Sequence, residues 1–200
     1  MVRATAEDCD RLSHLFGATI SEGRILAKNT GVCVEERYDV AYNLGSGRSP
    51  WPGWINVDSG TAADLNADLR KLPVESDTAD AVAAIHVLEH FFEWEAVPIL
   101  TEWKRILKPG GKLILELPCL DKIFAYVFRA MKAKEPVFEF MTLHAMYGDP
   151  KHKDPLMMHR TGYFKYQVEA KLKEVGFREI KDEVPNYHFV FRDMRITAIK

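Results

Sequence analysis

The sequence YNLGSGRSPWPGWINVD, residues 42–58, decides the fold. It contains the end of one apolar run, Asp39 to Leu44, and the whole of a second, Trp54 to Val57. Short apolar runs bounded by turn residues are typical of buried strands. Pro50 and Pro52 favour a loop between them, and this connection is shorter than the roughly twelve residues of a usual parallel crossover. The stretch therefore predicts two strands joined by a very short helix or by none.

Small and acidic residues stand where these two strands end. Gly45, Ser46 and Gly47 directly follow the first strand, where glycine lets the backbone turn tightly and leaves room for a ligand against exposed N–H groups. Asp58 ends the second strand, and its carboxylate only accepts hydrogen bonds, which suits the two hydroxyl protons of a ribose. Either feature alone also fits an ordinary turn or a helix cap. Their order and spacing together predict a nucleoside site.

Beyond this stretch, short apolar runs alternate with helical patterns, which is typical of an α/β fold with a mostly parallel sheet. Further strands are expected at 64–67, 80–85, 112–117, 177–183 and 187–199, and helices at 94–107, 121–134 and 166–175. The stretch at about 135–160 is rich in Met, His, Asp and Pro and has no clean period. Such a stretch predicts a lid or an acceptor-binding loop.

The composition indicates one domain with a small or neutral ligand. The chain has 200 residues, 47% of them hydrophobic, enough for one sizeable core. We expect the main domain to span 39–200 and residues 1–38 to form a helical cap over the cofactor cleft. Lys and Arg number 27 against 29 for Asp and Glu, so no overall field attracts nucleic acid.

The cysteines and the apolar runs bear on location. Cys9, Cys33 and Cys119 lie far apart, which indicates neither a disulfide framework nor a structural zinc site and favours the reducing cytoplasm. No apolar run approaches the roughly 20 residues of a membrane span, and the N-terminus has no secretory signal pattern. A cytoplasmic protein with no membrane contact is expected.

At this point the chain resembles the class I S-adenosylmethionine-dependent methyltransferases. The likeness rests on residues 42–58, ADLRKLP (67–73), HVLEHF (86–91) and LKPGGKLILELP (107–118), which follow one another in the family's order, and on VGFREI (175–180). The chain looks especially like the compact methyltransferases found among enzymes that modify cell-surface polysaccharides and other small molecules. The resemblance implies a three-layer Rossmann-like sandwich with a mostly parallel seven-stranded sheet, whose last strand is antiparallel. It also implies S-adenosylmethionine as the cofactor.

The resemblance further assigns parts of the cofactor to residues. It implies that Gly45, Ser46 and Gly47 pack against the methionine part and that Asp58 binds the ribose. It places Asp68 and Leu69 beside the adenine, and His86 and Leu88 near the sulfonium. Residues 45–47 are called the glycine corner below. Asn43, just before the glycine corner, and Ser59, directly after Asp58, complete the expected cofactor set.

One departure from the family concerns the glycine motif. It usually continues to a third glycine, where this chain has Ser49. A nicotinamide-binding domain is the natural rival, but it needs GxGxxG opening a helix and an acid roughly 20 residues further on. Here Pro50 takes the third-glycine position of that motif, and Asp58 follows too soon.

Methyl transfer from a sulfonium is an in-line displacement, so the protein mainly holds donor and acceptor together and removes a proton from a hydroxyl or amine. His90 follows the strand at 80–85 and is the first candidate base, because imidazole titrates near neutral pH. His159 is the second candidate. A structural role fits each histidine as well. We expect a small-molecule acceptor, methylated at oxygen; the alternatives are a non-catalytic S-adenosylmethionine-binding partner subunit and an RNA methyltransferase.

No metal is expected. Some small-molecule and RNA ribose O-methyltransferases resemble residues 86–90, with an acid, two further positions, then Glu and His that bind a divalent ion. Here His86 replaces the first acid. A mixed nitrogen and oxygen site built from Glu89, His90 and a loop histidine stays as an alternative.

Overall fold

The computed structural model describes residues 38–60 and 63–200. The expected helical cap at 1–38 therefore lies outside the described residues, except for Tyr38.

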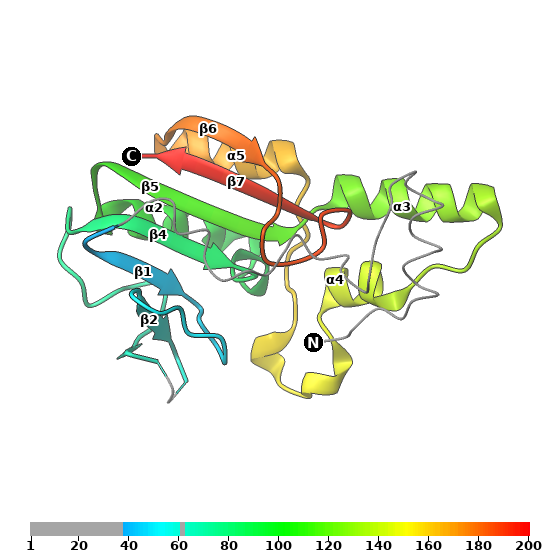
Figure 1. The fold of residues 1–200 in the computed structure, drawn as a ribbon, viewed down its shortest axis with the longest axis horizontal. Helices are drawn as coiled ribbons and strands as arrows, with labels where there is room; N and C mark the ends of the chain where they lie inside the picture. Colours follow the sequence, from blue (N-terminus) through cyan, green and yellow to red (C-terminus); the bar gives the residue numbers. More distant parts are fainter. Residues whose placement is uncertain (1–37, 61–62) are drawn as a thin grey trace.

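A single seven-stranded sheet organises the described chain (Figure 1). Its strands lie in the order β3-β2-β1-β4-β5-β7-β6. They are β1 (Ala41–Leu44), β2 (Ile55–Asp58), β3 (Leu65–Asn66), β4 (Ala79–Ile85), β5 (Leu107–Pro118), β6 (Arg178–Glu183) and β7 (Asp193–Ile199). The first five strands pair in parallel, and β7 runs antiparallel to both β5 and β6. The predicted α/β class, the mostly parallel sheet and the antiparallel last strand are confirmed.

Two helices, α2 (Ala96–Ile106) and α5 (Lys165–Val175), lie together behind the sheet (Figure 1). In α2 the residues Ile99, Leu100 and Trp103 are fully buried, as their three- and four-residue spacing predicts. Helix α5 ends at Gly176, whose φ of 85° closes the helix in the left-handed conformation. The helices predicted at 94–107 and 166–175 are confirmed, with ends shifted by a residue or two.

The two faces of the sheet differ in chemistry. On one face, apolar side chains such as Val82, Leu115 and Ile196 pack in one core with residues of α2 and α5. The opposite face carries buried polar side chains: Asn43, Asn56, Glu116, Asp193, Arg195 and Thr197. A buried polar group is costly unless it is hydrogen-bonded. The polar face therefore depends on a specific set of partners, and those partners shape the site described below.

Two strand boundaries differ from the prediction. Strand β5 begins at Leu107 rather than at 112, because Leu107 already pairs with Ala79 and the Pro-Gly-Gly at 109–111 is accommodated as an irregularity in the pairing. Strand β7 begins at Asp193 rather than at 187. Residues 186–188 give their backbone N–H groups to the side chain of Glu116 instead of to a neighbouring strand.

The stretch at 135–160 is built from short helical turns. Helix α3 (Leu120–Ala133) leads into η3 (Glu139–Met141), α4 (Leu143–Tyr147), η4 (Pro150–His152) and η5 (Pro155–Met157). Tyr126 and Met141 form a small second core there, with phenylalanines packed around them. Among the described residues, no helix is both long and apolar enough to cross a membrane. The role of this segment as a lid stays a prediction.

Candidate active site

The glycine corner after β1 is fixed by both space and backbone geometry. Gly45 has a φ of +67°, and a Cβ at this position would lie 2.5 Å from Cγ2 of Val87. The N–H groups of Gly45 and Ser46 both donate to the carbonyl of Val57, at 2.8 and 3.1 Å. These N–H groups were expected to be exposed toward a ligand. They instead join the corner to the end of β2.

Asp58 points toward this corner. Its Oδ2 accepts the N–H of Gly47 at 2.9 Å, and its Oδ1 accepts the N–H of Gly60 at 2.9 Å. Each carboxylate oxygen has two lone pairs, so both retain the capacity to accept a hydroxyl proton. The corner and the acid thus form one unit, although they come from different strands.

Asn43, expected in the cofactor set, is held in the buried polar network of the sheet. The Asn43 side-chain amide donates to Oδ1 of Asn56 at 3.0 Å. Asn56 in turn accepts the N–H of Trp51 at 2.7 Å, which shapes the loop between β1 and β2. Asn43 therefore helps to fix that loop through Asn56.

The remaining expected cofactor residues fall into two groups. Leu69 and Leu88 have their side chains in the apolar core, so only their backbone atoms are open to a ligand role. Ser59 and Asp68 lie on the surface, where Asp68 forms an ion pair with Arg70 at 3.2 Å. His86 lies at the end of β4 with a φ of 54°, in the left-handed region that non-glycine residues seldom adopt.

The structure brings His90 and His159 together. His90 belongs to η1 (Leu88–His90), directly after β4, and its ring centroid lies 4.8 Å from that of His159. Backbone hydrogen bonds hold the two segments together: Arg160 and Thr161 donate their N–H groups to the carbonyl of Glu89 at 2.7 and 3.2 Å. Two residues separated by the whole of 91–158 therefore share one site.

His86 stands between two buried carboxylates. Its Nδ1 lies 3.0 Å from Oε1 of Glu89, and its Nε2 lies 3.4 Å from Oδ2 of Asp193. Burial alone would lower the pKa of His86, but the negative charges of Asp193 and Glu89 outweigh it and raise the pKa to about 9. Burial would raise the pKa of Glu89, but His86 outweighs it and lowers the pKa to about 2.

Two half-buried imidazoles nearby, His159 and His188, have lowered pKa values instead. Burial lowers the pKa of His159, and burial together with the charge of His86 lowers the pKa of His188 to about 3. His188 packs against His86 with ring centroids 4.1 Å apart. Both imidazoles are therefore neutral near pH 7, and each has a ring nitrogen that can accept a proton or bind a metal.

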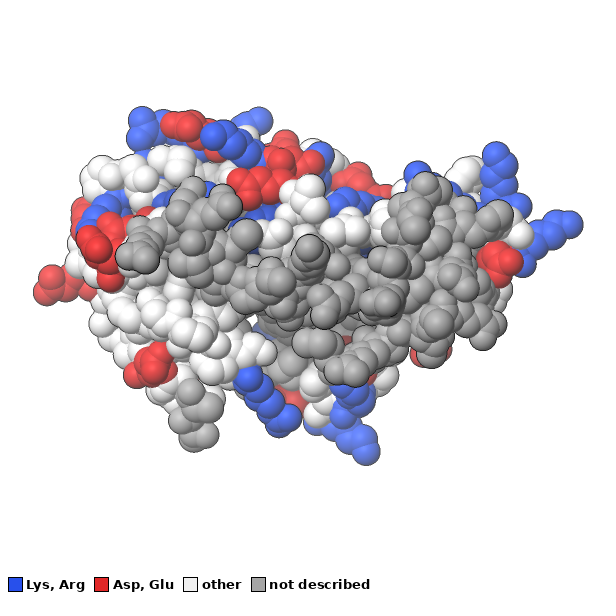
Figure 2. Space-filling model, in the orientation of Figure 1, with Lys and Arg blue, Asp and Glu red and all other residues white. Residues whose placement is uncertain are grey.

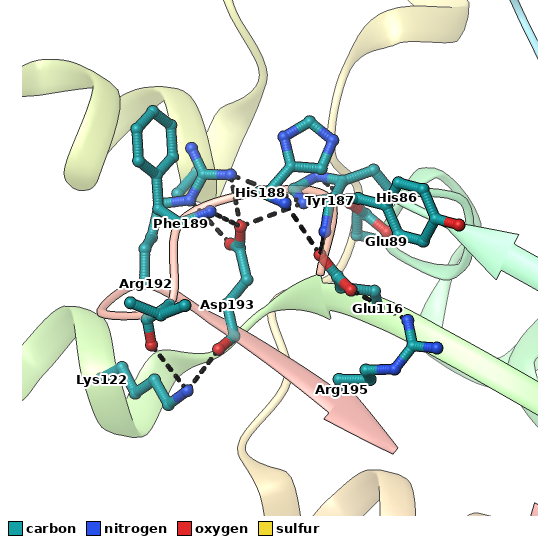
Figure 3. Close-up of polar contacts among 12 residues, drawn as sticks. His86, Glu89, Glu116, Lys122, Tyr187, His188, Phe189, Arg192, Asp193 and Arg195 are labelled. Carbon is teal, nitrogen blue, oxygen red and sulfur yellow. Dashed lines mark hydrogen bonds and ion pairs between the residues drawn. The ribbon is translucent and has the colours of Figure 1, made fainter. Parts of the chain in front are cut away.

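The loop between β6 and β7, together with Asp193 at the start of β7, supplies residues that the sequence analysis missed (Figure 3). Asp193 is fully buried, and its carboxylate binds the guanidinium of Arg192 at 2.7 and 2.8 Å. Burial would raise the pKa of Asp193, but Arg192 and His86 hold it well below its usual range. Asp193 thereby orients the His86 ring through its contact with Nε2.

Glu116 fixes the same loop from β5. It is fully buried, accepts the N–H groups of Asn186, Tyr187 and His188 at 2.9 Å each, and meets Arg195 at 3.2 Å. Held in this way, Tyr187 stacks on Trp51 with ring centroids 4.7 Å apart. A glutamate inside the apolar run at 113–118 is a signal that sequence reasoning can use, because charged residues are seldom fully buried without partners.

Comparison with known proteins identifies the kind of domain. The family model described as "Methyltransferase domain" matches residues 49–115, which include Asp58 and the turn from His86 to His90. No curated protein matches the chain.

Several solved structures share the fold. A SAM-dependent methyltransferase from Archaeoglobus fulgidus aligns with a TM-score of 0.54 at 15% identity, over 80% of this chain and 85% of that one. A possible histamine N-methyltransferase from Thermotoga maritima aligns with a TM-score of 0.55 at 13% identity, over 84% of each chain. The 1,6-didemethyltoxoflavin-N1-methyltransferase of Burkholderia thailandensis, with 1,6-didemethyltoxoflavin and S-adenosylhomocysteine bound, aligns with a TM-score of 0.53 at 13% identity, over 80% of this chain and 70% of that one.

Proposed function

We propose that this chain is a class I S-adenosylmethionine-dependent methyltransferase whose acceptor is a small molecule, methylated at oxygen. The acceptor binds at the imidazole cluster, defined as His86, His90, His159 and His188.

The observation that carries this proposal is the contact between the glycine corner and the turn after β4. Gly45 packs directly under Val87, which follows His86 in the chain. A cofactor bound against this corner and Asp58 would have the imidazole cluster as its neighbour. Methyl transfer requires the acceptor atom to lie in line with the sulfonium, so the groups beside the corner are the ones that meet the acceptor.

Methylation at oxygen is supported by the imidazole nitrogens of His90 and His159. His90 has its Nδ1 3.2 Å from the carbonyl of Met158, and His159 has its Nδ1 2.8 Å from the carbonyl of Ala145. When Nδ1 donates to these carbonyls, Nε2 of each ring carries a lone pair that can take a hydroxyl proton. His90 is the preferred base, because its contact with Met158 is exposed whereas that of His159 with Ala145 is partly buried.

A small acceptor is favoured over RNA by the distribution of charge. Along the upper rim of the face shown in Figure 2, Lys and Arg of the described residues are interspersed with Asp and Glu, whereas RNA binding relies on a run of basic side chains. The Burkholderia thailandensis relative by fold was solved with a small heterocycle bound. A cytoplasmic location is part of the proposal and is supported by the scattered cysteines.

Calorimetry with S-adenosylmethionine tests the cofactor site. Asp58→Ala removes the carboxylate beside the corner and should weaken binding at least about 10-fold, or ~1.4 kcal/mol. Glu174→Ala, which removes an exposed acid of α5 behind the sheet, is the matched control and should bind like the parent. Equal affinity in parent and Asp58→Ala would remove Asp58 from the ribose role.

Turnover tests the enzyme against the partner-subunit alternative. S-adenosylhomocysteine should form when hydroxylated small molecules are offered as acceptors. His90→Ala should then lower kcat by roughly 10²–10⁴-fold while the affinity for the cofactor stays the same. An unchanged kcat would dismiss His90 as the base, and no product with any acceptor of a broad panel would favour the partner subunit.

A further inference from the structure

We propose that His86, Glu89 and His159 form a binding site for one divalent transition-metal ion, of which Zn²⁺ is the reference. Each residue offers one ligand atom, and these atoms all lie within 4.8 Å of one another. Two come from the turn after β4, and the third comes from the far end of the segment at 135–160. This inference replaces the sequence-based expectation that the chain holds no metal.

Glu89 is the strongest pointer to a ligand. Its side chain is 2% exposed, and neither carboxylate oxygen has a hydrogen-bond partner among the described residues, although Oε1 lies 3.0 Å from Nδ1 of His86. Burying a carboxylate is costly unless hydrogen bonds or a cation satisfy its oxygens. A metal ion between Glu89 and the imidazole nitrogens would satisfy them.

Both histidines are oriented in the way that metal-binding histidines usually are. The second ring nitrogen of a metal-bound histidine commonly donates to a carbonyl or a carboxylate, which fixes the tautomer and the ring plane. Nδ1 of His159 lies 2.8 Å from the carbonyl of Ala145, which leaves Nε2 for the metal. Nε2 of His86 faces Asp193 at 3.4 Å, which leaves Nδ1 for the metal on the side of Glu89.

A second set of three, His86, His188 and Asp193, also brings its ligand atoms within 4.8 Å. It is the weaker candidate because Asp193 is already engaged. Its Oδ1 accepts from Arg192 at 2.7 Å, and its Oδ2 accepts from Arg192 at 2.8 Å and from the N–H of Phe189 at 3.1 Å. A cation there would sit beside the guanidinium that neutralises this carboxylate. Among the described residues, the cation that faces Glu89 is His86 itself, a member of the proposed set, which would release its proton to bind the metal.

The donor set selects the class of metal. Two imidazole nitrogens and one carboxylate oxygen suit Zn²⁺, Fe²⁺, Co²⁺ or Ni²⁺, whereas Mg²⁺ and Ca²⁺ prefer oxygen ligands throughout. Three protein ligands leave at least one coordination position open. If the proposed function holds, the open coordination position would take the acceptor oxygen. His90 would then remain the base; this consequence alone rests on the proposed function.

The test measures metal binding directly, on the full chain without an affinity tag and after treatment with a chelator. Calorimetry with Zn²⁺ should show one ion bound per chain, and Co²⁺ should give visible absorption bands that Zn²⁺ abolishes. Mg²⁺ in excess should not compete. A chain that binds neither Zn²⁺ nor Co²⁺ would overturn the inference, as would one that prefers Mg²⁺.

Variants locate the ion. Glu89→Gln keeps the shape of the side chain and should weaken Zn²⁺ binding by roughly 100-fold or more, as should His159→Gln. His90→Ala removes a neighbouring imidazole outside the set and is the matched control, expected to bind Zn²⁺ like the parent. His188→Ala probes the competing set. Unchanged binding in Glu89→Gln, or loss confined to His90→Ala or His188→Ala, would refute the assignment.

Two measurements keep the result independent of folding and of the proposed function. Circular dichroism and thermal unfolding identify a variant that fails to fold, and His159→Gln, at a half-buried position, carries the test if the fully buried Glu89 tolerates no change. The calorimetry with S-adenosylmethionine reads a different site. A chain that binds S-adenosylmethionine but no metal refutes the metal site alone, and one that binds Zn²⁺ but no cofactor refutes the proposed function alone.

Discussion

At Gly45, available space and backbone geometry both exclude a side chain. Gly45→Ala would place a methyl group 2.5 Å from Val87 at a φ of +67° and should lower the free energy of unfolding by about 2–4 kcal/mol. Gly47→Ala is the matched control, because its φ is +52° but no atom lies within 4 Å of the added methyl. It should cost only the backbone strain, about 1–2 kcal/mol. Urea denaturation measures both, and equal losses would mean that Val87 yields freely.

The sequence identified some of the site residues and missed others. The sequence predicted that the glycine corner and Asp58 lie at one edge of the sheet, because they come at the ends of two neighbouring parallel strands, and the structure joins Gly47 to Asp58 directly. It also selected His90 and His159, without a rule to connect them. Asp193 was missed because its partner His86 is more than a hundred residues away, and only the pairing of β7 with β5 brings the two together. No local pattern encodes that contact.

Among the elements, the loop between β6 and β7 depends on one carboxylate. Glu116→Gln replaces an acceptor of three backbone N–H groups with a side chain that also carries donors, so it should cost about 2–4 kcal/mol. Hydrogen exchange at residues 186–188 should accelerate with it. Glu183→Gln is the control, because Glu183 meets the same Arg195 at 3.2 Å but is 38% exposed. It should cost under ~1 kcal/mol and leave that exchange unchanged; matching effects would contradict the anchoring role.

Helix α2 provides a pH-dependent contribution to stability. Hydrogen bonds from Arg105 lower the pKa of Glu102, which also accepts the N–H of Leu72 at 2.7 Å. Because the folded-state pKa lies below the unfolded value of about 4.3, this carboxylate stabilises the fold above that pH and loses its effect as the pH falls through the folded-state pKa.

The parent should therefore exceed Glu102→Gln in free energy of unfolding by about 1 kcal/mol near neutral pH. The gap should shrink as the pH falls below the unfolded value and then through the lowered folded-state pKa of Glu102. Urea denaturation at three pH values checks this. A gap that stays constant with pH would show that the charge of Glu102 contributes nothing.

Periodicity predicted the elements that a local pattern determines. The apolar spacing in α2 and the glycine that ends α5 are contained in short windows of sequence. The start of β5 at Leu107 was missed because a Pro-Gly-Gly sequence usually ends an element, and here the neighbouring strand β4 holds it in the sheet. The first residues of the predicted last strand became a loop because Glu116 competes for their N–H groups.

For the whole molecule, the cofactor should act as a stabilising ligand. S-adenosylhomocysteine at 100 times its Kd should add about 2.7 kcal/mol to the free energy of unfolding. For a chain of 200 residues this raises Tm by roughly 2–4 °C per kcal/mol. Asp58→Ala should show a smaller rise at the same concentration, and Glu174→Ala the full one. A parent chain whose Tm ignores the ligand at every concentration would contradict the assigned cofactor.

The position of β7 between β5 and β6 has a consequence for the order of assembly during translation. Strand β7 leaves the ribosome after every other strand of the sheet, yet it fills an interior slot and brings Asp193 to His86. A nascent polypeptide arrested before residue 186 would already contain the glycine corner and the first five strands. It would nevertheless present the unpaired edge of β5 to chaperones, and His86 would still lack its contact with Asp193.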